Sequence, residues 1–397
     1  MNFDFSQVVE SHSCVMLSSY LIIETMKIAL VHDWLTNFAG AERVLLAMHE
    51  LWPEAPIFTT VYNSKNASQF AGADIRVSFM QKIPFAKKKH QMFLPLMPLA
   101  FESFDFSEYD VVLSTSHACS KGIVTKPKTL HICYCHTPMR YAWDGSQEYI
   151  QKAGFGKLFK SWLIPVMMNY LRVWDRATAD RVDEFLANSS FVAKRIKKYY
   201  QRDAKVLYPP VDCGRFGMSE GRNVGMSEGQ DFYLIVGRLV PYKRVDLVVE
   251  AFNENGRKLL IVGEGPEKGK LKKIAKENIT FLGHVSEAQV AELMSKCKAF
   301  IFPQEEDFGI SAVEAQAAGR PVIAYGEGGA LETIIEGKTG VFFKEQSAES
   351  LNLALERAEK ISFSPEEIRA HAQQFDIAIF KSRIKQFVEL KKENNGI

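Results

Sequence analysis

The chain has 397 residues, of which 47% are hydrophobic and 24% are charged, and its net charge at pH 7 is +2. This length is sufficient for two domains with separate cores, and the near-neutral charge argues against general binding of nucleic acid. The six scattered cysteines argue against a disulfide framework and fit a reducing cytoplasm.

The first 25 residues are set apart from the rest of the chain. They contain a short apolar run over residues 14–23, which is too short to span a bilayer and is preceded by acidic rather than basic side chains. We therefore expect residues 1–25 to be a poorly ordered N-terminal extension, with the fold beginning at Met26.

Residues 26–211 predict a first α/β domain, because apolar strands alternate with helices as in a doubly wound parallel sheet. The predicted strands are residues 27–32, 57–62, 109–116, 130–135 and 185–190, and the predicted helices are residues 41–51, 176–183 and 191–198. Gly40 opens the first of these helices. Backbone N–H groups at a helix N-terminus attract anions, so Gly40 is a candidate anion contact, with a plain tight turn as the alternative.

Residues 79–106 match no regular helix or strand pattern. They mix lysines, including Lys87, Lys88 and Lys89, with aromatic and aliphatic side chains, as an interfacial membrane segment does. A buried helix with a solvated lysine loop is an equal alternative, because three prolines interrupt a continuous amphipathic helix. A similar mixture recurs over residues 155–174.

Two predicted strands of this domain end in histidines. His117 follows residues 109–116, and His136 follows residues 130–135, four positions before Arg140. Ligands of open parallel sheets bind at the carboxyl ends of strands, which makes both histidines candidates for function. A structural role remains the alternative for each of them.

A second domain is expected after a linker. Residues 212–230 are polar and glycine-rich and repeat the sequence Gly-Met-Ser-Glu-Gly, which is typical of a linker. Residues 231–375 resume the alternation of strands and helices and predict a second doubly wound domain. An amphipathic helix within residues 376–397 ends the chain.

Arg238 and Lys243 lie on either side of the loop that follows the first strand of the second domain. Two cations beside a helix N-terminus suit a diphosphate, which a guanidinium and an ammonium group can bind together. The alternative is that both are ordinary surface charges.

A glycine turn follows the next predicted strand. Gly263, Glu264 and Gly265 suggest dinucleotide binding, and thus a nicotinamide-dependent oxidoreductase. The third glycine of that pattern falls one place late, at Gly269, and several lysines surround it, so this signal is weak.

The stretch from Glu305 to Glu314 joins a buried apolar strand to a helix that Gly319 ends. Glu306 therefore lies in a loop and Glu314 inside the helix, where both can face one crevice. A carboxylate accepts two hydrogen bonds from a vicinal diol, which suits sugar and ribose hydroxyls. Acidic residues that stabilise a helix start are the alternative.

The spacing of Glu306 and Glu314 resembles that of the retaining nucleotide-sugar glycosyltransferases of family 4, and the Gly-Arg-x-x-x-x-Lys pattern ending at Lys243 matches their pyrophosphate clamp. These enzymes have the GT-B architecture, in which two Rossmann-like domains face each other across a cleft. The resemblance covers roughly residues 26–390, and it implies that the helix within residues 376–397 crosses back onto the first domain. The block at residues 136–144 is similar to bacterial mannosyltransferases that build O-antigen and related polysaccharides.

The resemblance implies a role for each candidate residue. Glu306 would hold the donor hexose, Glu314 the ribose and Arg238 with Lys243 the diphosphate, while His117 would contact the transferred sugar. Glu306, His117, Arg238 and Lys243 are thus the expected catalytic residues. The other expected donor contacts are Gly40, Gly263, Glu264, Phe308, Gly309 and Ile310, and the other expected substrate contacts are Asp33, His136 and Arg140.

The resemblance implies retaining transfer of a hexose by a front-face route, without a covalent enzyme intermediate. GDP-mannose is the expected donor, and a glycan or polyprenyl-diphosphate-linked oligosaccharide is the expected acceptor. The enzyme would act in the cytoplasm, with the inner leaflet as a further partner. No Asp-x-Asp occurs in the chain, which fits a metal-independent site without cofactors. The alternatives are a UDP-sugar-dependent transferase of the same fold, the oxidoreductase, and a catalytically idle binding protein.

Overall fold

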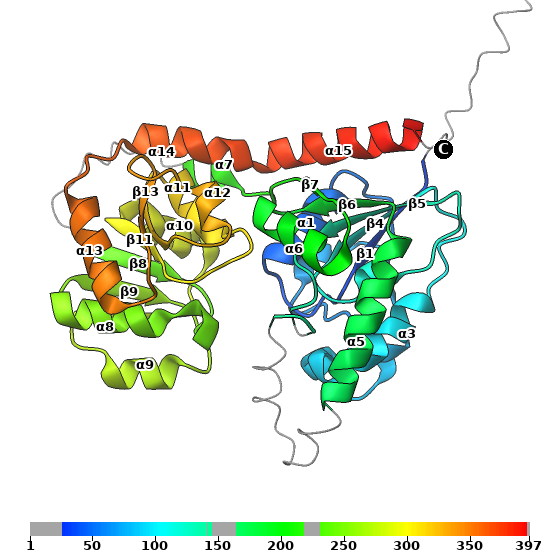
Figure 1. The fold of residues 1–397 in the computed structure, drawn as a ribbon, viewed down its shortest axis with the longest axis horizontal. Helices are drawn as coiled ribbons and strands as arrows, with labels where there is room; N and C mark the ends of the chain where they lie inside the picture. The colour runs from blue at the N-terminus through cyan, green and yellow to red at the C-terminus, as the bar shows by residue number, and fades with distance from the viewer. Residues whose placement is uncertain (1–25, 141, 145–163, 218–230, 395–397) are drawn as a thin grey trace, which may run out of the picture.

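The structure is a computed structural model that describes residues 26–140, 142–144, 164–217 and 231–394. These residues form two α/β units that lie next to each other along the long axis of the molecule (Figure 1). The expected N-terminal extension, most of the expected linker and residues 155–163 of the second apolar and basic stretch lie outside the described residues.

The described part of the first unit contains a parallel sheet of seven strands in the order β3-β2-β1-β4-β5-β6-β7. Its strands are β1 Ile28–His32, β2 Ile57–Thr59, β3 Ile75–Val77, β4 Val111–Ser116, β5 Leu130–Cys135, β6 Glu184–Ala187 and β7 Lys205–Val206. Its α-helices are α1 Gly40–His49, α2 Ala86–Lys89, α3 Met97–Glu102, α5 Ile164–Thr178 and α6 Ser190–Tyr200, and its 3₁₀ helices include η2 Phe79–Lys82, η3 His90–Leu96 and η4 Ser120–Gly122.

The second unit is built on a parallel sheet of six strands in the order β10-β9-β8-β11-β12-β13, counted over the described residues. Its strands are β8 Phe232–Val236, β9 Lys258–Val262, β10 Ile279–Gly283, β11 Ala299–Phe302, β12 Val322–Tyr325 and β13 Gly340–Phe343. Its helices are α7 Cys213–Gly217, α8 Val245–Asn255, α9 Lys268–Ile274, α10 Glu287–Lys296, α11 Ile310–Ala317, α12 Ala330–Thr333, α13 Ala348–Glu359 and α14 Pro365–Ala372.

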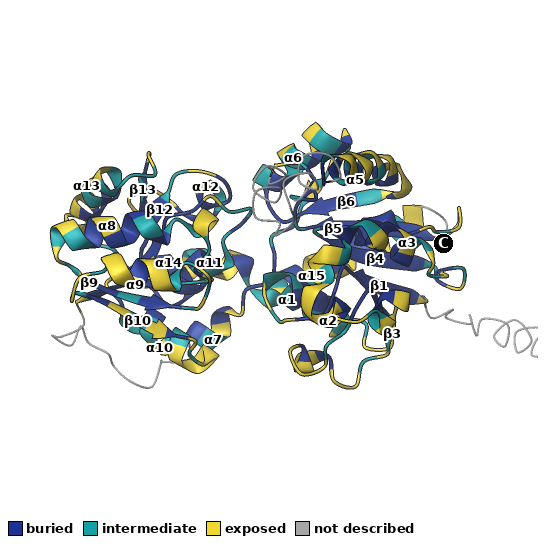
Figure 2. Ribbon diagram, turned by 90° about the horizontal axis from the view of Figure 1, so that it is seen from below, coloured by how far each residue is buried: buried dark blue, intermediate teal, exposed yellow. Residues whose placement is uncertain are grey.

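The central strands are buried on both faces. Every residue of β1, β4, β5 and β11 is buried, as expected for apolar runs that helices cover from both sides of a parallel sheet (Figure 2). The doubly wound α/β fold predicted from the sequence is therefore confirmed. In each sheet the strand order reverses at one point, between β1 and β4 and between β8 and β11.

The last helix, α15 Ile377–Asn394, returns from the second unit to the first (Figure 1). Its buried side chains Phe380, Ile384, Phe387 and Val388 belong to the same core cluster as residues of β1, β4, β5 and α1. At the crossing point, Val211 exchanges two 3.0 Å backbone hydrogen bonds with residues 375 and 377. The core of the first unit thus includes residues from the far end of the chain.

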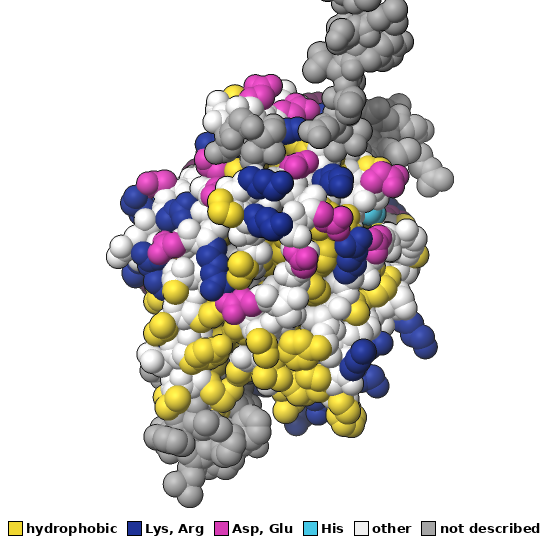
Figure 3. All heavy atoms as spheres, turned by 90° about the vertical axis from the view of Figure 1, so that its right-hand side faces the viewer, with side chains coloured by type: hydrophobic (Ala, Val, Ile, Leu, Met, Phe, Trp, Pro, Cys, Tyr) yellow, Lys and Arg dark blue, Asp and Glu magenta, His cyan; other side chains and the backbone are white. Residues whose placement is uncertain are grey.

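The segment over residues 79–106 forms the short elements η2, α2, η3 and α3. Leu94, Met97 and Phe101 are buried, while Phe85 and Leu99 are exposed, so the segment is only partly buried. Apolar side chains gather on the outer face of the first unit, with lysines and arginines near them (Figure 3). No helix among the described residues is both long enough and apolar enough to cross a membrane.

Several helices differ from the sequence prediction, and one of them, α7, lies within the expected linker. The predicted helix over residues 176–183 is wrong in position, because α5 spans Ile164–Thr178 within the described residues and a 3₁₀ helix follows at Ala179–Arg181. The helix α13 was not predicted at all, although its buried Leu351, Ala354, Leu355 and Ala358 follow helical spacing.

A buried ion pair fixes α5 against the loop after β4. Lys121 Nζ lies 2.9 Å from Asp175 Oδ1, and both side chains are almost fully buried. The other carboxylate oxygen of Asp175 accepts hydrogen bonds from Trp143 at 2.8 Å and Tyr200 at 2.9 Å. Every group in this pair therefore has a partner, as buried charges require.

Replacing Lys121 with methionine is expected to lower the free energy of unfolding by about 3–5 kcal/mol, because Asp175 would remain buried without its cation. Denaturation in urea, followed by circular dichroism, measures this change. Lys194→Met, on the exposed surface of α6, is the matched control and should shift stability by less than about 0.5 kcal/mol. Equal stability of the two variants would contradict the assigned role of the pair.

Candidate active site

The candidate residues lie on loops at the two points where strand order reverses. The loops after β1 and β4 carry Gly40 and His117, and the loops after β8 and β11 carry Lys243 and Glu306. Parallel strands that diverge at such a point leave a crevice beyond their carboxyl ends, where ligands bind. The loops of the two units face each other here.

Gly40 lies at the contact between the units. A Cβ atom at this position would lie 3.0 Å from the Cδ1 atom of Ile310, at the start of α11. The Ala39 N–H donates a 2.9 Å hydrogen bond to Glu42, which closes the first turn of α1. Glycine thus lets the start of α1 approach the start of α11. Two of the predicted site residues, Gly40 and Ile310, therefore lie next to each other.

Asp33 holds the turn that carries His117. Its buried carboxylate accepts four hydrogen bonds of 2.7–2.9 Å from the backbone N–H groups of residues 117–120. The Nδ1 atom of His117 lies 3.1 Å from the same carboxylate. Asp33 is fully buried, so its carboxylate positions His117 and does not face the crevice.

His117 is a neutral group in these surroundings at pH 7. Burial lowers the pKa of its imidazole, and the Asp33 carboxylate opposes that shift only in part. Burial and the proximity of His117 likewise hold the pKa of His136 well below its usual value. The two rings lie 6.1 Å apart. A neutral imidazole can donate one hydrogen bond and accept another, which suits a hydroxyl group.

Trp34 and His90 join this cluster, and neither was predicted from the sequence. The Trp34 ring lies 4.5 Å from the ring of His117 and 4.5 Å from that of His90. Burial and His117 lower the pKa of His90 to about 4. His90 begins η3, far from β1 in the sequence, so no spacing pattern could have indicated the contact.

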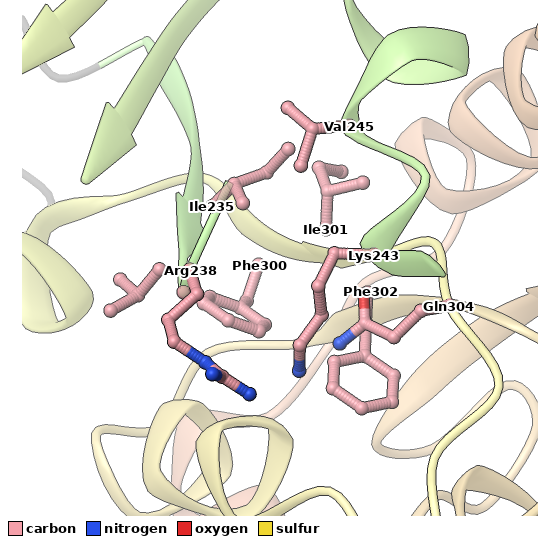
Figure 4. A pocket seen from close by; sticks show the side chains of 10 residues that line it. Ile235, Arg238, Lys243, Val245, Phe300, Ile301, Phe302 and Gln304 are labelled. Atoms are coloured by element: carbon pink, nitrogen blue, oxygen red, sulfur yellow. The ribbon is translucent and has the colours of Figure 1, made fainter. Parts of the chain in front are cut away.

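Arg238 and Lys243 project in the same direction from the loop between β8 and α8, beside a small pocket that Phe302 and Gln304 help to line (Figure 4). Arg238 donates a 3.0 Å hydrogen bond to the hydroxyl of Tyr242, and its side chain is exposed. Lys243 forms an ion pair with Glu306. The structure therefore brings together three of the four predicted catalytic residues in the second unit.

Glu314 lies in an ion-pair cluster that spans both units. Its Oε1 atom accepts hydrogen bonds from Arg43 of α1 at 2.7 Å and from Arg215 of α7 at 3.2 Å. Both arginines also pair with Glu287, at 2.8 and 2.6 Å. Burial raises the pKa of Glu314, and the two arginines oppose this shift. Among the described residues, none forms a hydrogen bond with its Oε2 atom, which leaves that oxygen for a ligand.

Asp307 forms a second ion-pair cluster between the units. Arg140 lies 2.7 Å from one of its oxygens, and Arg195 of α6 lies 3.0 Å from the other. Burial raises the pKa of Asp307, and both arginines oppose the shift. Arg140 therefore pairs with a carboxylate of the facing unit. Asp307, Arg195, Arg43 and Arg215 were not among the predicted site residues, because ion pairs between distant segments leave no local pattern.

The remaining predicted donor contacts have structural explanations. A Cβ atom at Gly263 would lie 1.9 Å from the carbonyl oxygen of Gly237, so glycine permits two loops to pack. Glu264 pairs with Lys268 on α9 at 2.5 Å. Phe308 packs its buried ring near Tyr208 and Phe375. Gly309 has a φ of 92°, a conformation that favours glycine, where the chain enters α11.

The arrangement as a whole suits a ligand that carries both negative charge and hydroxyl groups. Arg238 and Lys243 can bind an anion, and Glu306 and Glu314 can accept hydrogen bonds from diols. His117 lies at the corresponding strand-order reversal of the other unit.

Two family models match the chain, one for each unit. The model described as Glycosyltransferase Family 4 matches residues 38–215, and the model described as Glycosyl transferases group 1 matches residues 220–375. Together they take up most of the chain.

Curated relatives of the chain include two mannosyltransferases. An alpha-1,3/1,6-mannosyltransferase of Dictyostelium discoideum is 26% identical over 60% of this chain and 64% of its own. A GDP-mannose-dependent alpha-(1-6)-phosphatidylinositol monomannoside mannosyltransferase of Mycobacterium tuberculosis is 30% identical over 47% of this chain and 54% of its own. Across the first relatives, the chain spans between about half and two thirds of the relative's length.

Solved structures with the same fold cover almost the whole chain. HepE of Anabaena, solved in complex with UDP, has a TM-score of 0.65 and 19% identity over 92% of this chain and 100% of its own. Sucrose-phosphate synthase of Thermosynechococcus elongatus has a TM-score of 0.69 and 17% identity over 92% and 98%. These similarities establish the fold, and with the two family models they show that the chain belongs to the family 4 glycosyltransferases of the GT-B architecture.

Proposed function

We propose that the protein is a retaining glycosyltransferase that moves mannose from GDP-mannose to a glycan or a polyprenyl-diphosphate-linked oligosaccharide in bacterial polysaccharide synthesis. The observation that carries the proposal is the meeting of Arg238, Lys243, Glu306 and Glu314 at one strand-order reversal, with His117 at the corresponding reversal of the other sheet. The mannosyltransferases among the relatives support mannose as the hexose, and the GDP-mannose-dependent one supports the donor.

Each residue has a role in the proposed reaction. Arg238 and Lys243 neutralise the diphosphate, which stabilises the leaving group as the anomeric bond breaks. Glu306 accepts hydrogen bonds from the hexose. When the donor binds, the Lys243 ammonium leaves its ion pair with Glu306 and binds the diphosphate instead. The free Oε2 atom of Glu314 accepts the ribose hydroxyls, while Arg43 and Arg215 hold the other oxygen.

The acceptor side of the proposed site consists of histidines. His117 and His136 are neutral at pH 7 and can bind hydroxyl groups of the transferred sugar and of the acceptor. Asp33 and Arg140 act indirectly in this proposal, because Asp33 positions His117 and Arg140 binds the facing unit through Asp307. The two cations supply the positive charge at the diphosphate, so the proposed reaction requires neither a metal nor a cofactor.

A second candidate donor is a UDP-sugar. HepE has been solved with UDP and with UDP-glucose on the same fold, which supports a uridine nucleotide as the alternative. The nicotinamide-dependent reaction has no support, since packing between loops explains Gly263.

Thermal unfolding against GDP, UDP, ADP, their mannose, glucose and N-acetylglucosamine conjugates, and NAD tests the donor. GDP and GDP-mannose are expected to raise the midpoint selectively, since a ligand at a hundred times its Kd adds about 2.7 kcal/mol to the stability of the folded state. Selective stabilisation by UDP compounds would show that the donor is a UDP-sugar and would leave the proposed transfer reaction unchanged. Stabilisation by NAD alone would contradict the glycosyltransferase proposal.

Glu306→Ala tests the donor site. Transfer of mannose from GDP-mannose is expected to fall on the order of 100-fold, because a charged hydrogen-bond acceptor at the reacting sugar is lost. The unfolding midpoint should change little, since Glu306 and Lys243 are both partly exposed. Glu305→Ala removes the same charge from the exposed neighbouring position and should keep the wild-type rate. Wild-type transfer by Glu306→Ala would remove Glu306 from the site.

A further inference from the structure

We infer that the outer face of the first unit, formed by η2, α2, η3, α3 and α5, docks on an anionic lipid bilayer. This docking face would bring an acceptor held in the bilayer to the His117 side of the crevice, a consequence that rests on the proposed function.

The docking face exposes an unusual amount of apolar surface. Its exposed side chains are Phe79, Phe85, Met92, Leu96, Leu99, Val166, Tyr170 and Val173, with exposed fractions from 40% to 74%. The inner sides of the same elements meet in one core cluster that includes Leu94, Met97 and Leu171. Trp174 of α5 donates a 3.0 Å hydrogen bond to Glu102 of α3, so these two helices lie together. Their outward side chains therefore belong to one continuous face (Figure 3).

Phe85 is the most exposed of these side chains, at 74%. Its φ of 64° is uncommon for a bulky residue and costs conformational energy. This strained conformation does not bury the ring. Hydrogen bonds from the N–H groups of Lys88 and Lys89 to its carbonyl, at 3.0 and 2.8 Å, hold the turn. The fold thus fixes an aromatic ring in an outward position.

The charge of the docking face complements an anionic surface. Between residues 76 and 101 the sequence has no aspartate or glutamate, although the whole chain is close to neutral. Lys82, Lys87, Lys88 and Lys89 are exposed, and within the described parts of the chain none of them has an ion-pair partner. Lysines around protruding aromatic and aliphatic side chains are what binding to anionic lipid headgroups requires.

The docking face is continuous with the candidate active site. His90 follows Lys89 directly, and its ring contacts Trp34, which in turn contacts His117. Two ring contacts, between His90 and Trp34 and between Trp34 and His117, therefore connect the lysine segment to His117. A bilayer under the lysines would lie next to the acceptor side of the crevice.

Sedimentation of the full chain with vesicles tests the inference. The protein is expected to bind vesicles of phosphatidylcholine with phosphatidylglycerol at low salt, to bind phosphatidylcholine alone weakly, and to be released by high salt. Two variants should each partition at least about tenfold more weakly, Phe85→Ser with Leu99→Ser, and Lys87→Gln with Lys88→Gln and Lys89→Gln. Unchanged unfolding midpoints would show that both variants are folded.

Matched controls come from the second unit. Leu353→Ser, at an exposed position of α13, and the triple replacement of Lys270, Lys272 and Lys273 with glutamine on α9 should bind vesicles like the wild type. Failure of the wild type to bind anionic vesicles, or equal loss in control and test variants, would overturn the inference. A dimer in light scattering that Phe85→Ser with Leu99→Ser abolishes would overturn it in favour of a second copy of the chain.

The outcome separates docking from the proposed function. Stabilisation by GDP-mannose, measured on the docking variants in solution, should equal that of the wild type, because the substitutions lie outside the donor site. Vesicle binding without any nucleotide stabilisation would leave the docking face standing and overturn the donor. Nucleotide stabilisation without vesicle binding would overturn the docking face and leave the proposed donor standing.

Discussion

The contact between the two units depends on two carboxylates of the second unit, buried Glu314 and partly buried Asp307, that pair with arginines of the first. Asp307 and Glu314 both lose hydration, and burial raises both pKa values, so each would be costly without its partners. Arg140 and Arg195 satisfy the first, and Arg43 satisfies the second together with Arg215. Asp307 follows Glu306 directly, and Glu314 lies in α11, the helix that this loop enters. The same ion pairs that join the units therefore also position the loop that carries Glu306.

The two sheets supply complementary halves of this site. The first provides the uncharged imidazole of His117. The buried Asp33 carboxylate does not face the ligand, because it accepts hydrogen bonds from the backbone of the His117 turn. The second provides cations and carboxylates that neutralise each other, as Lys243 does with Glu306. A ligand that separates this pair must satisfy both groups, which favours molecules with an anion and a diol close together.

Local features of the site were readable from the sequence, and distant contacts were not. The strand β5 has the predicted bounds, because a continuous apolar run between turn residues defines a buried strand. The cation pair and the two glutamates also follow from local spacing. Arg43 and Glu314 lie 271 residues apart in different units, and nothing in either segment specifies the other. Asp33 illustrates the same limit, since only the folded chain shows that its carboxylate is buried.

The return of α15 has a consequence for the order in which the molecule is completed. The side chains that close the core of the first unit, from Phe380 to Val388, are synthesised after the strands of both sheets. The sheet of the first unit leaves the ribosome before the second unit, yet an apolar surface of that sheet and of α1 stays open until the second unit and α15 have emerged. The first unit therefore does not correspond to an uninterrupted stretch of the chain, and its core is complete only when α15 is in place.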